Sequence, residues 1–215
     1  MSFPLTPDSL LSPTIDNAQE CPILEVSKYV TEPAAEPSAQ LKALIQGLGL
    51  IKHREGGYFK ETDRSPFTME VGKNSMSTSP NTGEESVVTR NYSTLIYYLL
   101  TPDAPIGKLH KNKNRITHIL QRGRGQYVLI YPNGQVKSFR VGFDYKNGEL
   151  SQWVVPGGVY KASFIVPNTE FDDGLLISEV VVPGFDFEDH TFMSGYEELA
   201  DLVGETRAKE LKFLL

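Results

Sequence analysis

Two histidines in a segment rich in lysine and arginine have side chains that can do chemistry in two ways. His110 and His118 can move a proton near neutral pH, and a neutral imidazole can also bind a transition metal. Metal sites of this kind usually combine imidazole with carboxylate, and no Asp or Glu occurs from Ala104 to Phe143. We therefore treat both histidines as candidate catalytic residues, and we expect neither a metal ion nor a cofactor.

A second set of reactive side chains flanks a glycine pair earlier in the chain. His53, Glu55 and Tyr58 combine a base, an acid and a phenol, the types used in proton transfer. Tyr58 is a candidate catalytic residue, and His53 and Glu55 are candidate ligand-binding residues. Glu61 and Arg64 follow, and a guanidinium can hold an anion through two hydrogen bonds. The competing interpretation is structural, with Tyr58 packing a strand and Glu61 pairing with Arg64.

Positive charge is concentrated around the two central histidines. The segment contains eight cations and no acid: Lys108, Lys111, Lys113, Arg115, Arg122, Arg124, Lys137 and Arg140. One interpretation is a basic rim that attracts an anionic ligand such as a phosphate or a carboxylate. The other is an ordinary solvated surface, balanced by acids elsewhere in the chain. We expect Arg115 and Lys161 to be pocket cations that bind a ligand, and most of the others to be surface residues.

The elements that must position these residues are predicted mainly as short β-strands. The dipeptides Asn133-Gly134 and Asn147-Gly148 are typical of tight turns between strands. No segment between Tyr92 and Phe187 has the length and period of a crossover helix. The pattern therefore favours an all-β sandwich or barrel. The expected strands are 57–62, 92–101, 116–121, 126–131, 136–143, 152–155, 159–166 and 175–182.

The flanking segments have a different character. Residues 1–38 hold six of the 14 prolines and are expected to form an extended, poorly structured arm. Ser38 is expected to cap a helix that starts at Ala39, at the beginning of a β-barrel domain over residues 39–193. Residues 65–91 are expected to be a surface loop within that domain. Ser194 and Glu197 match a capping box, so residues 194–215 are predicted as helices that pack on the barrel.

The overall composition argues against several classes of partner. A net charge of −6 gives no general attraction to nucleic acid or to anionic membranes. The longest strongly apolar run, residues 95–100, is far shorter than the about 20 residues that cross a bilayer. Cys21 is the single cysteine, so no internal disulfide can form. We expect a cytoplasmic or nuclear protein that binds neither nucleic acid nor membranes.

Three stretches resemble a known family. They are residues 53–65 (HREGGYFKETDRS), residues 181–189 (VVPGFDFED) and residues 155–158 (VPGG). They are similar to the DUF985 family, also called Cupin_5, and the resemblance spans about residues 41–193. It implies a cupin jelly-roll β-barrel with a few flanking helices, which forms a homodimer and closes around a small-molecule pocket.

The chain also departs from that family's pattern. Members often have an Asp-Glu pair after the histidine that matches His110, whereas Arg115 and Ile116 stand there in this chain. His190 stands where the family often has phenylalanine. Metal-binding cupins supply a third histidine shortly after a Pro-x-Gly turn, and Lys161 occupies that position. An ammonium group repels a metal cation, which adds to the case against a metal site.

Three functions remain open from the sequence. The first is a metal-free isomerase or epimerase, in which His110 or His118 abstracts a proton, a tyrosine returns one, and Lys161 or Arg115 stabilises an enolate or a phosphate. The second is a protein that binds a small, anionic organic molecule without catalysis. The third is a metal-dependent oxygenase or isomerase, in which Glu179 joins His110 and His118, because its strand parity with Ile177 and Val181 allows it to face inward.

Overall fold

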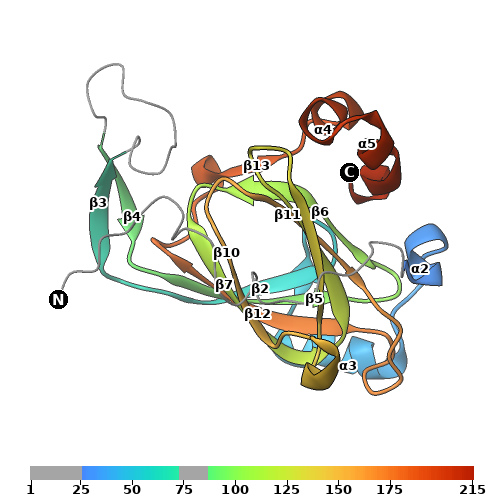
Figure 1. Ribbon diagram of the computed structural model, residues 1–215. Coiled ribbons are helices and arrows are strands. Elements are labelled where there is room, and N and C mark those ends of the chain that lie inside the picture. The colour runs from blue at the N-terminus through green and yellow to red at the C-terminus, as the bar shows by residue number, and fades with distance from the viewer. Residues whose placement is uncertain (1–25, 73–86) are drawn as a thin grey trace.

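The computed structural model describes residues 26–72 and 87–215. Two antiparallel β-sheets pack face to face, and helices cover their outer faces (Figure 1). The chain is therefore the all-β jelly roll that the sequence predicts. Among the described residues the strand pairings do not join the two sheets into a closed barrel.

The larger sheet has six strands, and all its neighbours are antiparallel. In spatial order they are β1 (Ile51–Lys52), β2 (Tyr58–Arg64), β5 (Thr94–Leu100), β12 (Leu175–Val182), β7 (Arg115–Gly123) and β10 (Gln152–Val155). The five longest of these strands match predicted runs to within a few residues. Residues 51–52 were not predicted to form a strand.

The smaller sheet has five strands, again all antiparallel. In spatial order they are β13 (His190–Phe192), β6 (Ile106–Asn112), β11 (Tyr160–Ile165), β8 (Gly125–Ile130) and β9 (Val136–Val141). The sequence predicted β8, β9 and β11. It did not predict β6 or β13, which are mostly polar, and these two strands carry residues of the site described below.

A two-stranded hairpin projects from the side of the sandwich (Figure 1). It consists of β3 (Thr68–Gly72) and β4 (Val87–Asn91), which pair antiparallel. The prediction of a surface loop over 65–91 is therefore wrong at both ends of that segment. Its centre, residues 73–86, lies outside the described residues, as do residues 1–25 of the predicted arm.

The main core lies between the two sheets. Because side chains alternate between the two faces of a strand, every second residue of each strand contributes to this core. On β11, Tyr160 and Ala162 pack on the outer face, so Lys161 and Ile165 point between the sheets. On β12, Ile177 belongs to the same inner core. This alternation fixes which polar residues of the inner strands can reach a pocket.

Helices cover the outer faces. The helix α3 (Ala39–Leu48) lies on the larger sheet, and its cap is as predicted, since the Ser38 hydroxyl accepts a hydrogen bond from the Leu41 N–H. The helices α4 (Tyr196–Val203) and α5 (Glu205–Leu211) cover the smaller sheet. The predicted capping box does not form: Gly195 is the N-cap of α4 and makes no side-chain cap hydrogen bond, while Glu198, and not Glu197, accepts from the Ser194 N–H. The shorter elements are α2 (Lys28–Thr31), η2 (Tyr145–Asn147), η3 (Phe187–Asp189) and η4 (Lys212–Leu214).

The two predicted turns have different outcomes. Asn133-Gly134 lies in the connection between the paired strands β8 and β9, so the predicted hairpin is present. Gly134 has a positive φ of 81° but Asn133 does not, and the Tyr131 N–H donates to the Gln135 carbonyl oxygen, so the turn is not the predicted two-residue type. Gly148 also has a positive φ, of 77°, but it follows η2 in a connection between β9 and β10. Those two strands belong to different sheets, so Asn147-Gly148 is a turn but not a β-hairpin.

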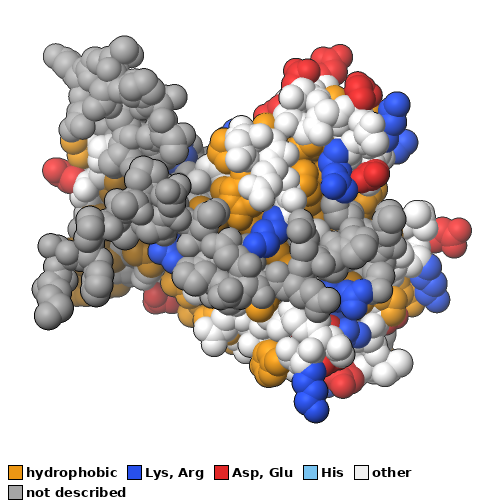
Figure 2. Space-filling view, in the orientation of Figure 1, with side chains coloured by type: hydrophobic (Ala, Val, Ile, Leu, Met, Phe, Trp, Pro, Cys, Tyr) orange, Lys and Arg blue, Asp and Glu red, His pale blue; other side chains and the backbone are white. Residues whose placement is uncertain are grey.

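Charges on the outer surface are mixed. Figure 2 shows lysine, arginine and acidic side chains interspersed over the described part of the face that it presents. Within residues 26–72 and 87–215, no helix combines the length and the apolar character that a bilayer crossing requires.

Candidate functional site

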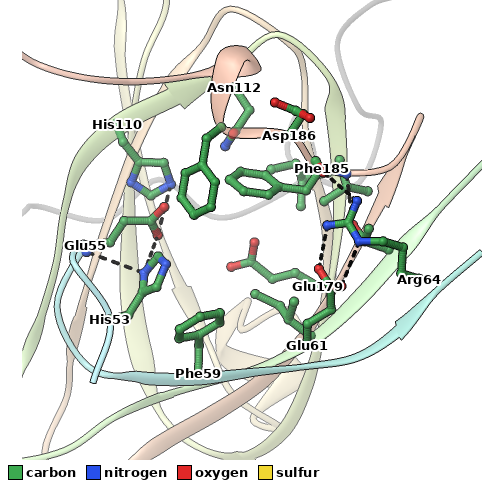
Figure 3. Close-up of a pocket in the computed structure, with 15 residues that line it drawn as sticks. His53, Glu55, Phe59, Glu61, Arg64, His110, Asn112, Glu179, Phe185 and Asp186 are labelled. Carbon is green, nitrogen blue, oxygen red and sulfur yellow. Dashed lines mark hydrogen bonds and ion pairs between the residues drawn. The ribbon is translucent and has the colours of Figure 1, made fainter. Parts of the chain in front are cut away.

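A cavity of about 470 Å³ lies between the sheets, toward the end where β2, β6 and β12 meet the segment before β13. Its walls are largely apolar, formed by Phe59, Ile96, Ile116, Val181, Phe185 and Phe187. Figure 3 shows His53, Glu55 and His110 on one side of this cavity and the Glu61–Arg64 pair on the opposite side. Glu179 projects between them. Polar groups therefore converge from several strands on an apolar cavity, as in many small-molecule sites.

Glu55 is placed by the glycine pair that follows it. Gly56 and Gly57 have φ values of 104° and 67°, which strongly favour glycine. A Cβ on Gly56 would lie 2.0 Å from the carbonyl oxygen of Ile106, so the turn packs closely against β6. The Lys108 N–H donates to the carbonyl oxygen of Glu55 at 2.7 Å. The turn thereby brings the Glu55 carboxylate next to the histidine carried by β6.

Three histidines surround the Glu55 carboxylate. His190 Nε2 donates to Glu55 Oε1 at 2.8 Å. His110 Nε2 lies 3.4 Å from Glu55 Oε2, and His53 Nδ1 lies 3.6 Å from the same oxygen. His110 and His190 are diagonal neighbours on β6 and β13, and their rings stack with centroids 5.0 Å apart.

The electrostatics of this group follow from burial and from the histidines. Burial alone would raise the pKa of Glu55, but His110, the hydrogen bond from His190, and His53 together hold that pKa below its ordinary value. Burial lowers the pKa of His110 to about 4, despite the opposing effect of Glu55. Burial also lowers the pKa of His53. At neutral pH the carboxylate is therefore ionised, and His110 and His53 are neutral.

A buried ion pair anchors the segment that carries His190. The guanidinium of Arg90 donates to both carboxylate oxygens of Asp189, at 2.8 and 3.1 Å. Arg90 and Asp189 are only 7% and 3% exposed. Asn114 also donates to Asp189, at 3.4 Å. Because His190 directly follows Asp189, this network holds its ring against β6.

Deeper in the molecule, Lys161, Glu179 and His118 form a second polar group. The ammonium of Lys161 donates to Glu179 Oε2 and to His118 Nε2, both at 2.9 Å. His118 is completely buried and stacks on Trp153, with ring centroids 5.1 Å apart. Burial raises the pKa of Glu179 although Lys161 opposes it, and burial lowers the pKa of His118 well below its ordinary value.

This second group argues against the third hypothesis, in which His110, His118 and Glu179 bind a metal ion. His118 does not line the cavity, and its Nε2 accepts a hydrogen bond from Lys161. His118 Nε2 and Glu179 Oε1 are 3.5 Å apart, with the ammonium group bound to both side chains. The positive charge that a metal ion would supply is already present, so these residues do not fit one.

Glu61 and Arg64 form the structural pair that was the alternative prediction. Arg64 donates to both oxygens of Glu61, at 2.8 and 2.7 Å. It also donates to Asn91 Oδ1 at 2.9 Å and to the carbonyl oxygen of Phe185 at 3.1 Å. Both side chains line the cavity, but the guanidinium is already bonded to protein groups. It is therefore poorly placed to bind a ligand anion.

Two predicted site residues lie elsewhere. Tyr58 points away from the cavity toward α3, because it alternates with Phe59, and its hydroxyl donates to Asp103 at 2.7 Å. Arg115 is exposed at the start of β7 and is not among the residues lining the cavity. Lys161 does reach the interior, but it is bound to Glu179 and His118. The predicted basic pocket is therefore wrong.

Sequence reasoning missed His190 as a site residue. It also missed Asp186 and the aromatic residues Phe185 and Phe187, which line the cavity. The available signal was the resemblance itself, since residues 181–189 form one of the matching stretches. His190 directly follows that stretch, at a position where the family often has phenylalanine, and this departure was the signal that marked it as a candidate site residue.

Comparisons with known proteins agree with this fold. Residues 42–193 match the model of a family described as Cupin superfamily (DUF985). The uncharacterised protein YML079W of Saccharomyces cerevisiae is 69% identical over 191 residues, which cover 89% of this chain and 94% of that protein. A solved hypothetical protein from Leishmania major is 28% identical with a TM-score of 0.61, covering 75% of this chain and 90% of that one.

A second solved structure, protein SO0799 from Shewanella oneidensis, has a TM-score of 0.62. It is 22% identical, and the match covers 84% of this chain and 98% of that chain. A likeness at this identity shows the fold alone.

Proposed function

The chain belongs to the DUF985 family of the cupin superfamily, and we propose from the geometry of its cavity that it binds a small organic molecule there. The observation that carries this proposal is the cavity of about 470 Å³ with apolar walls and converging polar groups. Pockets of about 300–1,000 Å³ suit small ligands and cofactors.

The charges of the cavity favour a neutral or cationic ligand over the anion expected from the sequence. Four carboxylates line it, and Arg64 is the single lysine or arginine among the described residues that do so. Arg64 is bonded to Glu61, and Lys161 is bonded to Glu179. Among the described residues, Glu55 and Asp186 make no salt bridge to a lysine or arginine, although Asp186 lies near enough to Arg64 to help raise its pKa.

The shape of the cavity suggests the form of the ligand. Figure 3 shows the rings of Phe59 and Phe185 on two sides of the space into which Glu179 projects. Aromatic walls favour a flat apolar group, and carboxylates favour a ligand that presents N–H or O–H donors. We therefore expect a compact, flat molecule with hydrogen-bond donors and no net negative charge.

A ligand-observed NMR screen tests this proposal. A fragment library of neutral, cationic and anionic aromatic compounds is measured with the wild-type protein and with Ile96→Trp, whose larger side chain fills the cavity. Tyr97→Trp is the matched control. Tyr97 is the next residue along β5, and its side chain packs on the buried cluster under α3 instead of lining the cavity. We expect cationic and neutral fragments to bind the wild type and the control but not Ile96→Trp. Binding of anionic fragments alone, or equal binding to all three proteins, would refute the proposal.

Acid–base catalysis of the isomerase or epimerase type is a second candidate, supported by one specific observation. His110 Nδ1 lies 2.7 Å from the carbonyl oxygen of Lys108 and donates to it, which leaves Nε2 unprotonated at the cavity. An unprotonated Nε2 can accept a proton from a bound substrate. His110→Gln should then abolish turnover of any substrate found for the wild type while fragments still bind. Unchanged turnover would rule out this role.

A further inference from the structure

Glu55, His110 and His190 place three metal-ligating atoms in one small volume. One atom from each residue lies within 4.8 Å of the other two, and this is the one such group found among residues 26–72 and 87–215. Two imidazoles and one carboxylate form a common ligand set for divalent transition metals, and they leave further coordination positions open. The group therefore has suitable chemistry for a metal ion. Two of its members, His110 and His190, come from strands that the sequence did not predict.

The orientation of His110 suits a ligand. Its Nδ1–H donates to the carbonyl oxygen of Lys108, so the lone pair of Nε2 faces Glu55 Oε2 at 3.4 Å. Histidine ligands usually donate their other ring N–H to an acceptor in this way, which fixes the tautomer and the ring. Two electron-rich atoms that face each other in a buried site are stabilised by a cation between them.

The surroundings hold the group in place and leave it open on one side. The side chains of His110 and His190 are 6% and 4% exposed, and that of Glu55 is 12% exposed. Glu55 and His110 line the cavity, and His190 stacks on His110. A metal bound here would have protein ligands on one side and the cavity on the other, where a ligand oxygen or nitrogen can complete its coordination.

We propose that Glu55, His110 and His190 bind one divalent transition-metal ion of the Zn²⁺ and Co²⁺ type at the wall of the cavity. The two rings lie within 19° of parallel, so they must turn for both lone pairs to point at one ion. His190 Nε2 gives up the proton that it donates to Glu55, and that proton moves to Nδ1 through solvent. When the metal is bound His110 is a ligand, so its role as a base applies to the metal-free protein.

This site differs from the set His110, His118 and Glu179 that the third hypothesis from the sequence considered, and it departs from the expectation of no metal ion. It shares only His110 with that set, and Lys161 and Glu179 form their own ion pair outside it. The proposal does not rest on the proposed organic ligand, because binding of the metal alone can be measured. If no fragment binds, the metal site can still be present. If no metal binds, the cavity can still bind an organic molecule.

Titration of the metal-free protein with Co²⁺, followed by calorimetry and by visible absorption, tests the proposal. We expect one Co²⁺ per chain in the wild type, with an absorption spectrum that reports nitrogen and oxygen ligands. His190→Phe keeps an aromatic ring against His110 and Phe192, and Glu55→Gln keeps the size of the side chain. Each should weaken binding by at least about 100-fold, because even outer-shell changes cost about 10–100-fold.

Glu61→Gln is the matched control for Glu55→Gln, because Glu61 lines the same cavity but is bonded to Arg64 and lies outside the group. Its Co²⁺ affinity should stay within a few-fold of the wild type. Circular dichroism confirms that each variant is folded before titration. The proposal is overturned if the wild type binds no stoichiometric Co²⁺, if His190→Phe binds it as tightly as the wild type, or if Glu61→Gln loses binding as strongly as Glu55→Gln.

Discussion

The buried ion pair between Lys161 and Glu179 allows a quantitative prediction about stability. Lys161→Met keeps most of the side-chain volume but removes the ammonium that donates to Glu179 and His118. The Lys161 and Glu179 side chains are 4% and 10% exposed, so water cannot replace the lost contacts easily. Breaking a buried pair by removing one partner costs about 3–5 kcal/mol. For a chain of this size, that corresponds to a decrease in Tm of roughly 6–20 °C.

This loss comes from the carboxylate that remains buried, and a double variant isolates that cause. Lys161→Met combined with Glu179→Leu removes both charges and should recover at least half of the stability lost by Lys161→Met, since apolar replacements of buried pairs are often neutral. Chemical unfolding is followed by the fluorescence of Trp153, the single tryptophan, which stacks on His118. A double variant as unstable as Lys161→Met would refute the electrostatic explanation and point to packing.

The same variant should show a characteristic dependence on pH. Burial and the nearby Glu55 raise the pKa of Glu179, and Lys161 is the neighbour that lowers it. Without Lys161, the pKa in the folded state lies further above the ordinary value of 4.5. When the pKa of a carboxyl group is higher in the folded state than in the unfolded state, the protein loses stability as the pH rises from the unfolded-state pKa toward the folded-state pKa. The stability deficit of Lys161→Met should therefore be smaller at pH 4 than at pH 7, and a deficit independent of pH would contradict this.

Three further predictions concern the elements that position the site. Arg90→Met leaves Asp189 buried without its main partner and should lower the free energy of unfolding by about 3 kcal/mol in urea melts, whereas an unchanged midpoint would show that the pair is not needed. Gly56→Ala places a Cβ 2.0 Å from a backbone oxygen at a φ of 104°, so we expect a loss of at least about 1–3 kcal/mol and weaker Co²⁺ binding; normal Co²⁺ affinity would contradict the role of this turn. Ser38→Ala should cost about 1 kcal/mol through the lost cap of α3 with no effect on Co²⁺ binding, which thermal melts and titration would check together.

Much of the fold was predictable because strand alternation is a local property. Runs of apolar residues at every second position predicted most strands, and the same period placed His118 and Glu179 on inward faces. The cap at Ser38 depends on four consecutive residues, 38–41, and was also predicted correctly. The strands β6 and β13 were missed because polar and charged residues dominate them, so alternation gives a weak signal there.

The site was predicted only in part, because it depends on contacts between distant segments. Six residues named from the sequence line the cavity: His53, Glu55, Glu61, Arg64, His110 and Glu179. The partnership of Glu55 with His190 spans 135 positions along the chain, and no local pattern reports it.

The prediction of a basic pocket failed for a related reason. Residue type does not reveal whether a cation at a strand end points outward, as Arg115 does, or whether an inward cation already has a partner, as Lys161 does. Homodimerisation, which the family resemblance implies, stays a prediction that sedimentation of the purified protein would test.

The central claim is that the cavity between the sheets is the ligand site, and a crystal structure with the tightest fragment from the NMR screen tests it most directly. We predict electron density for a flat compound between Phe59 and Phe185, with its donor groups toward Glu179 or Glu55. Density for the fragment at another place on the molecule, with this cavity filled only by water, would contradict the account.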